Sequence, residues 1–141
     1  MEPHLTLLSL GVTDVGRARR FYVDGLGWPT VLDVPGELLM IQVGHGLVLS
    51  LWDLDQMRAE IGPVGAPGLA SVALAHNVAD AESVTRVLET AVAAGATLVA
   101  PAQVREWGGV SGYFADPDGY RWEVAFNAGL VVTADGTVTV G

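Results

Sequence analysis

Residues 5–14 read LTLLSLGVTD, and residues 71–80 read SVALAHNVAD. Both stretches are mostly apolar, as expected of a buried strand, and each ends in an aspartate, Asp14 or Asp80. A carboxylate at such a position accepts hydrogen bonds from the free N–H groups of a following helical turn. The pattern therefore predicts two copies of one strand-and-helix unit, whose aspartates lie 66 residues apart (80 − 14).

The helices predicted after these aspartates cover residues 15–26 and 81–94, where apolar residues recur at helical spacing. Gly27 and Gly95 follow the two helices directly. Glycine adopts the left-handed conformation that ends many helices without steric strain. Both helices thus have a start signal and a stop signal in the same order.

Three short strands are predicted after each helix, and a tight turn joins the last two strands of each half. The turns are Gly44-His45-Gly46 and Asp116-Pro117-Asp118-Gly119, in which Gly and Pro supply the backbone angles of a turn. The predicted strands cover residues 30–34, 38–43 and 47–52 in the first half and residues 97–101, 110–115 and 120–126 in the second. Each half therefore has the order βαβββ.

We expect one domain over residues 1–141, because a chain of this length has room for one shared core. Its expected parts are a first module over residues 5–52, a Gly- and Pro-rich linker over residues 53–69, a second module over residues 70–127 and a terminal hairpin over residues 128–141. The linker contains a short predicted helix over residues 56–61. Asp135-Gly136 is the signal for a two-residue hairpin turn.

The composition excludes several classes of partner and site. Seven basic and sixteen acidic side chains give a net charge of −9, which repels nucleic acids and anionic membrane surfaces. The absence of cysteine excludes disulfides, thiolate metal sites and thiol nucleophiles. No secretory signal and no apolar run of about 18 residues is present. We therefore expect a cytoplasmic protein with no nucleic-acid or membrane partner.

Four motifs together resemble the vicinal-oxygen-chelate superfamily of glyoxalases, bleomycin-resistance proteins and extradiol dioxygenases. They are Leu10-Gly-Val-Thr-Asp14, Arg20-Phe-Tyr22, Leu26-Gly-Trp28 and Gly112-Tyr-Phe-Ala-Asp-Pro-Asp-Gly-Tyr-Arg-Trp-Glu123. The resemblance implies an α+β fold in which two βαβββ modules form an incomplete, curled barrel with helices outside. It also implies a ligand in the concavity and a homodimer.

In such families, one residue on the first strand and one on the last strand of each module hold a divalent metal. The resemblance assigns these positions to Leu7, Ser50, Ala73 and Glu123, of which only Glu123 is a usual ligand of divalent ions. A shift of two residues, for example to Ser9, adds no good ligand. We therefore expect no metal and no cofactor.

Without the metal ligands, the concave face is expected to be a mostly apolar slot with one carboxylate. Because side chains alternate along a strand, Val48 and Trp52 are expected on the same face as Ser50, and Arg121 on the same face as Glu123. The candidate pocket residues are Leu7, Ser9, Trp28, Val48, Ser50, Trp52, Ala73, Trp107, Tyr113, Arg121 and Glu123. For each tryptophan, packing in the core or in a dimer interface is the alternative.

Two ionisable residues have both a structural and a functional interpretation. Glu123 either pairs with an arginine, Arg121 or Arg105, or occupies a family position that has lost its role, or serves as a pocket carboxylate or catalytic base. For His76, a structural role with a hydrogen bond near the helix start is favoured over a role as a base, because parity places it on the face of Leu74.

Three functions are consistent with these features. The first is a metal-independent, bleomycin-resistance-like protein that binds a small, basic or aromatic molecule in the concavity. The second is a divergent enzyme of the superfamily, either a metal-dependent lyase or dioxygenase or a metal-free isomerase with Glu123 as base. The third is a protein of assembly only, in which Trp52 and Leu7 fill the concavity.

Overall fold

The computed structural model describes residues 1–68 and 71–141. Residues 69 and 70, where the predicted linker meets the second module, lie outside the described residues.

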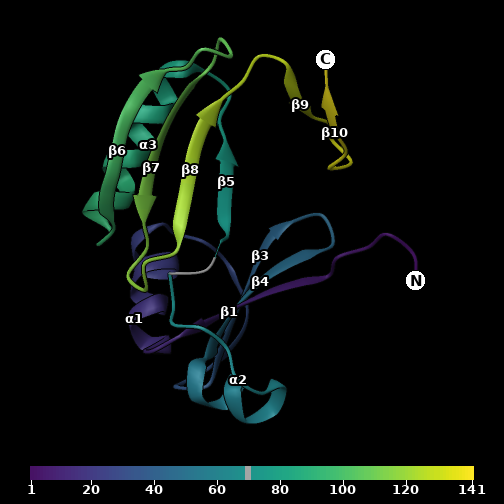
Figure 1. Ribbon diagram of the computed structural model, residues 1–141, viewed down its shortest axis with the longest axis vertical. Helices are drawn as coiled ribbons and strands as arrows, with labels where there is room; N and C mark the ends of the chain where they lie inside the picture. The colour runs from purple at the N-terminus through teal and green to yellow at the C-terminus, as the bar shows by residue number, and fades with distance from the viewer. Residues whose placement is uncertain (69–70) are drawn as a thin grey trace.

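The first half of the chain forms a four-stranded sheet with one helical segment, as the sequence predicts (Figure 1). Its elements are β1 Leu7–Val12, α1 Val15–Arg19, η1 Arg20–Gly25, β2 Thr30–Val34, β3 Leu38–Gly44 and β4 Leu47–Asp53. The strand order is β1-β4-β3-β2, and β1 pairs in parallel with β4. The remaining neighbours are antiparallel.

The second half repeats this topology. Its elements are β5 Ala73–Asn77, α3 Ala81–Ala93, β6 Thr97–Val104, β7 Val110–Ala115 and β8 Arg121–Phe126. The strand order is β5-β8-β7-β6, again with the first and last strands of the unit parallel. The two predicted βαβββ units are therefore confirmed, and the described residues contain no closed barrel.

The predicted helix starts are confirmed, but the first helix differs in its course. Asp14 accepts a hydrogen bond from the Arg17 N–H at 2.9 Å, and Asp80 accepts one from the Ser83 N–H at 2.8 Å. After α1, the backbone widens into the π-helical segment η1, in which the Leu26 N–H donates to the carbonyl five residues back. The consecutive aromatic residues Phe21 and Tyr22, both buried, lie in this segment.

Two predicted boundaries change because of local contacts. α2 spans Leu54–Ile61, two residues longer at its start than predicted, because the Asp53 carboxylate accepts the Gln56 N–H at 3.0 Å. β6 continues past Pro101, which an edge strand tolerates because one side of the strand has no pairing partner. The irregular register between Ala100 and Gln103 also spares Pro101 a ladder hydrogen bond.

The predicted terminal hairpin forms, with a wider turn than expected. β9 Leu130–Val132 pairs antiparallel with β10 Val138–Val140. The Thr133 N–H donates to the Thr137 carbonyl at 2.9 Å, so three residues rather than two form the loop. The hairpin projects from the end of β8, away from α3 (Figure 1).

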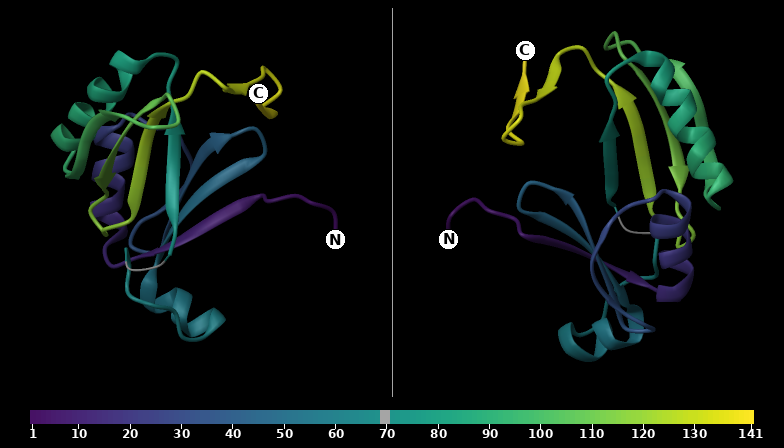
Figure 2. Two further views of the ribbon diagram at one scale, coloured as in Figure 1. Left: turned by 45° about the horizontal axis from the view of Figure 1, so that its top comes forward. Right: turned by 180° about the vertical axis from the view of Figure 1, so that it is seen from behind.

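Each sheet has a core face, covered by α1 and η1 or by α3, and an opposite open face (Figure 2). The core face carries most of the buried apolar side chains of both sheets: Leu10, Val12, Leu39, Ile41, Leu49, Leu51, Phe114, Trp122 and Val124. The open face carries the alternate residues of each strand, including Ser50, which is nonetheless buried, and the partly buried Glu123. α2 covers part of the first sheet's open face at Gly11, where an added Cβ would lie 2.6 Å from Leu54 Cδ1.

Candidate functional site

The Asp116-Pro117-Asp118-Gly119 turn joins the two modules through its carboxylates. Asp118, whose side chain is only 2% exposed, accepts hydrogen bonds from the Thr13 N–H at 3.0 Å and from the Arg17 guanidinium at 2.8 Å. Asp116 accepts the backbone N–H groups of Asp118 and Tyr120, both at 2.9 Å. These two carboxylates therefore hold the turn and the start of α1 together.

A buried network extends from this turn to the aromatic residues of the core. The Tyr22 hydroxyl donates to Asp116 Oδ2 at 2.5 Å and accepts the Trp122 indole N–H at 3.0 Å. Burial raises the pKa of the Tyr22 hydroxyl well above its ordinary value, and burial also raises the pKa of Asp116. Tyr22 from the first module and Asp116 and Trp122 from the second, all within the resemblance motifs, thus form one structural connection between the modules.

The open face of the second sheet carries a polar cluster around Glu123. The Tyr113 hydroxyl donates to Glu123 Oε1 at 2.8 Å, and this hydrogen bond raises the pKa of Tyr113. The guanidinium of Arg105 lies over the Tyr113 ring at 5.7 Å and donates to the Ser111 hydroxyl at 2.9 Å. Arg121 donates instead to the Gly119 carbonyl. Within the described residues, neither arginine forms an ion pair with Glu123, and its second carboxylate oxygen accepts no hydrogen bond from a side chain.

The superfamily implies a divalent metal on this face, but the donor set does not fit one. The strand register places Ser9 beside Ser50 and Ala75 beside Glu123. The first-strand neighbours are thus Ser9 and Ala75, two residues from the predicted Leu7 and Ala73. No three His, Asp or Glu side chains of residues 1–68 and 71–141 come together as a metal would require.

The other predicted pocket residues are divided between surfaces. Leu7, Ala73 and Arg121 are exposed on the open faces, and Val48 and Trp52 are partly buried there. Because Leu7 is 41% exposed, it does not plug a concavity in the isolated chain. Trp107 is 52% exposed in the loop between β6 and β7.

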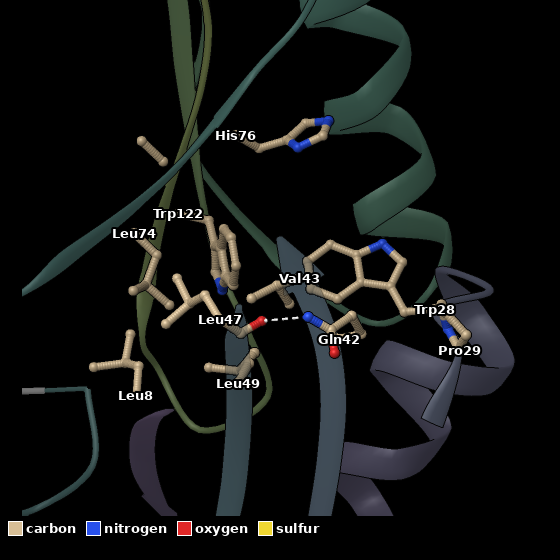
Figure 3. Close-up of a pocket in the computed structure, with 11 residues that line it drawn as sticks. Leu8, Trp28, Pro29, Gln42, Val43, Leu47, Leu49, Leu74, His76 and Trp122 are labelled. Carbon is tan, nitrogen blue, oxygen red and sulfur yellow. Dashed lines mark hydrogen bonds between the residues drawn. The ribbon is translucent and has the colours of Figure 1, made fainter. Parts of the chain in front are cut away.

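Trp28 lies apart from this group, on the core-face side. Its ring packs against Tyr22 at 5.5 Å and edge-on against Trp122 at 5.6 Å. It lines a cavity of about 370 Å³ between the two modules, together with Leu49 from the first sheet and Leu74 from the second (Figure 3). This is within the size range of small-molecule pockets.

His76 also lines this cavity, which differs from the structural role expected for it. Its side chain makes no hydrogen bond within the described residues, and partial burial lowers its pKa, although the residue as a whole is exposed. The shared face of His76 and Leu74 was visible in the sequence. On β8, Trp122 pairs with Leu74 and shares this face, but only the fold places Trp28 at the same cavity.

Comparisons with known proteins agree with this architecture. The model of the Glyoxalase/Bleomycin resistance protein/Dioxygenase superfamily matches residues 3–124. A glyoxalase-related enzyme from Fulvimarina pelagi is similar at 38% identity over 99% of both chains, with a TM-score of 0.91. A glyoxalase/bleomycin resistance protein/dioxygenase from Nocardioides is 26% identical over 89% of this chain and 84% of that one, with a TM-score of 0.74.

TioX from Micromonospora sp. ML1 shares the fold, with a TM-score of 0.64 at 23% identity over 87% of this chain and 98% of that one. No curated protein matches the chain. No helix of the described residues is long and apolar enough to cross a membrane. The family match over most of the chain confirms the resemblance seen in the motifs, and the chain therefore belongs to the Glyoxalase/Bleomycin resistance protein/Dioxygenase superfamily.

Proposed function

We propose that this protein binds a small organic cation, with or without an aromatic ring, on the open face of the second sheet and without a metal ion. The main support for this proposal is the Glu123 carboxylate. Tyr113 donates a hydrogen bond to it at 2.8 Å, and no arginine of the described residues forms an ion pair with it. A fixed carboxylate with a free oxygen attracts an ammonium or amidinium group. The net charge of −9 favours the approach of a cation.

The neighbouring residues suit binding better than metal chemistry. Ala75, the register neighbour of Glu123, offers no ligand for a divalent ion, and its small side chain leaves room for an organic group. A second copy of the chain is the expected cover for this face, in a homodimer. Ala73 and Ala75 are exposed in the single chain, and the second copy supplies the apolar wall that covers them.

The first test compares benzamidine with benzamide, its uncharged analogue of similar shape, by isothermal titration calorimetry. Benzamidine is expected to bind the protein, and Glu123→Gln is expected to weaken it at least tenfold, because a charge-assisted hydrogen bond contributes about 1.5–3 kcal/mol. Tyr113→Phe keeps the carboxylate and is expected to weaken benzamidine by less than about fivefold. Equal affinity for benzamidine and benzamide, or no effect of Glu123→Gln, would refute the proposal.

The metal-free part of the proposal is tested separately. Thermal stability is measured with and without Ni²⁺, Zn²⁺, Mn²⁺ or Fe²⁺, and metal content is measured on the purified protein. No stoichiometric metal and no shift of the midpoint are expected. A midpoint rise that a chelator reverses and that Glu123→Gln abolishes would instead favour a metal-dependent enzyme of the superfamily.

A further inference from the structure

The cavity between the modules differs from the Glu123 site in position and chemistry. Most of its wall residues on β1, β4, β5 and β8 alternate with Ser50 and Glu123, and Ala75, the register neighbour of Glu123, also lines it. A second, smaller cavity of about 160 Å³ adjoins it and shares Trp28, His76 and Trp122. The smaller cavity is also lined by Val87, Thr90 and Ala91 of α3.

The walls select for an uncharged molecule. None of the residues that line the larger cavity is Asp, Glu, Lys or Arg. A charged ligand group would therefore lose its hydration without gaining a charged partner, which is unfavourable. The indoles of Trp28 and Trp122 meet edge to face at 76°, and this corner offers an aromatic ring both a flat face and an edge.

Two polar groups at the rim can position such a ligand. The Gln42 amide nitrogen donates to the carbonyls of Gly44 and Leu47, which leaves its amide oxygen as an acceptor (Figure 3). The His76 imidazole has no hydrogen-bond partner among the described residues and lines both cavities. A neutral imidazole without a partner can accept a hydrogen bond from a ligand hydroxyl.

We propose that this cavity is a second binding site, which takes a small uncharged aromatic molecule bearing a hydroxyl group. The ring packs against Trp28 and Trp122, and the hydroxyl donates to His76. The site goes beyond the proposed function, since Glu123 does not line the cavity and the ligand needs neither a positive charge nor the Glu123 carboxylate.

The probe is 2-naphthol, with naphthalene as the matched molecule that lacks the hydroxyl, and equilibrium dialysis measures both dissociation constants. Wild-type protein is expected to prefer 2-naphthol. In His76→Phe, which keeps a ring at this position, the ratio of the naphthalene constant to the 2-naphthol constant is expected to fall about tenfold, as the loss of one hydrogen bond requires.

A blocking variant tests the location. Val43 lines the cavity and is 40% exposed, so Val43→Trp has room to fold and is expected to weaken both probes at least tenfold. Val99→Trp is the control, because Val99 is 47% exposed on a strand and does not line the cavity. Thermal midpoints of both variants report whether they fold.

Three results would overturn the proposal. They are no binding of 2-naphthol to wild-type protein, an unchanged probe ratio in His76→Phe, and equal binding by Val43→Trp and Val99→Trp. Loss of 2-naphthol binding in Glu123→Gln would place the probe on the open face and would overturn it as well. The benzamidine experiment is independent of all four results, so the two proposals can fail separately.

Discussion

Removing one oxygen atom, in Tyr22→Phe, tests whether the buried network joins the two modules. Tyr22 is fully buried, and its hydroxyl makes two hydrogen bonds, to Asp116 at 2.5 Å and from Trp122 at 3.0 Å. The variant keeps the ring and its packing. It leaves Asp116 Oδ2 and the Trp122 N–H without these partners inside the core.

The expected cost follows from these two contacts. A hydrogen bond to a charged group contributes about 1.5–3 kcal/mol, and a buried donor left unsatisfied costs about 1–3 kcal/mol. These two losses, partly offset by relaxation of the surrounding side chains, should lower the free energy of unfolding of Tyr22→Phe by about 3 kcal/mol. For a chain of 141 residues this corresponds to a fall of roughly 12 °C in the melting temperature.

Urea denaturation at pH 7 measures the change, with Tyr113→Phe as the control. Tyr113 makes the same kind of hydrogen bond to a carboxylate, but on the partly exposed open face, so its loss should cost less than about 1 kcal/mol. If the two variants lose the same free energy at unchanged m-value, or if Tyr22→Phe loses less than about 1 kcal/mol, the assigned role of the network is wrong.

Three further predictions concern charged and titrating groups. Asp118→Ala should destabilise the protein by about 2 kcal/mol or more in urea, because it removes the acceptor shared by Thr13 and Arg17, and a loss below about 0.5 kcal/mol would contradict this. Because burial raises the pKa of Asp116, the native state binds this proton more tightly than the unfolded chain. The protonated Asp116 side chain therefore contributes stability below pH 3.8, and this contribution falls as pH rises through the raised pKa. Asp116→Asn should then cost more free energy of unfolding at pH 4 than at pH 7 in paired urea titrations. Burial lowers the pKa of His76, so the imidazole stays neutral to below pH 6.5. The affinity for 2-naphthol should therefore be constant from pH 8 to pH 6.5 and weaken at lower pH. An equal decline in His76→Phe would exclude His76 as the cause.

The sequence by itself determined the topology and the family. The aspartate and glycine signals at Asp14, Gly27, Asp80 and Gly95 are local, because a helix cap depends on a few neighbouring backbone groups. The same holds for the tight turns, and the repeat then fixed the order βαβββ twice. The motif that ends at Glu123 identified the superfamily before any contact was known.

Only the tertiary structure decided which side chains meet. Strand alternation assigned Ser50 and Glu123 each to the face of its own sheet opposite the buried core residues, but the parallel register that pairs Ala75 with Glu123 depends on contacts between distant segments. Trp28 follows a helix and has no strand parity, so its place beside Trp122 and His76 comes from the packing of one module on the other. Local patterns fix the elements because they depend on neighbouring residues, whereas a cavity is made by residues from different elements and requires their relative positions.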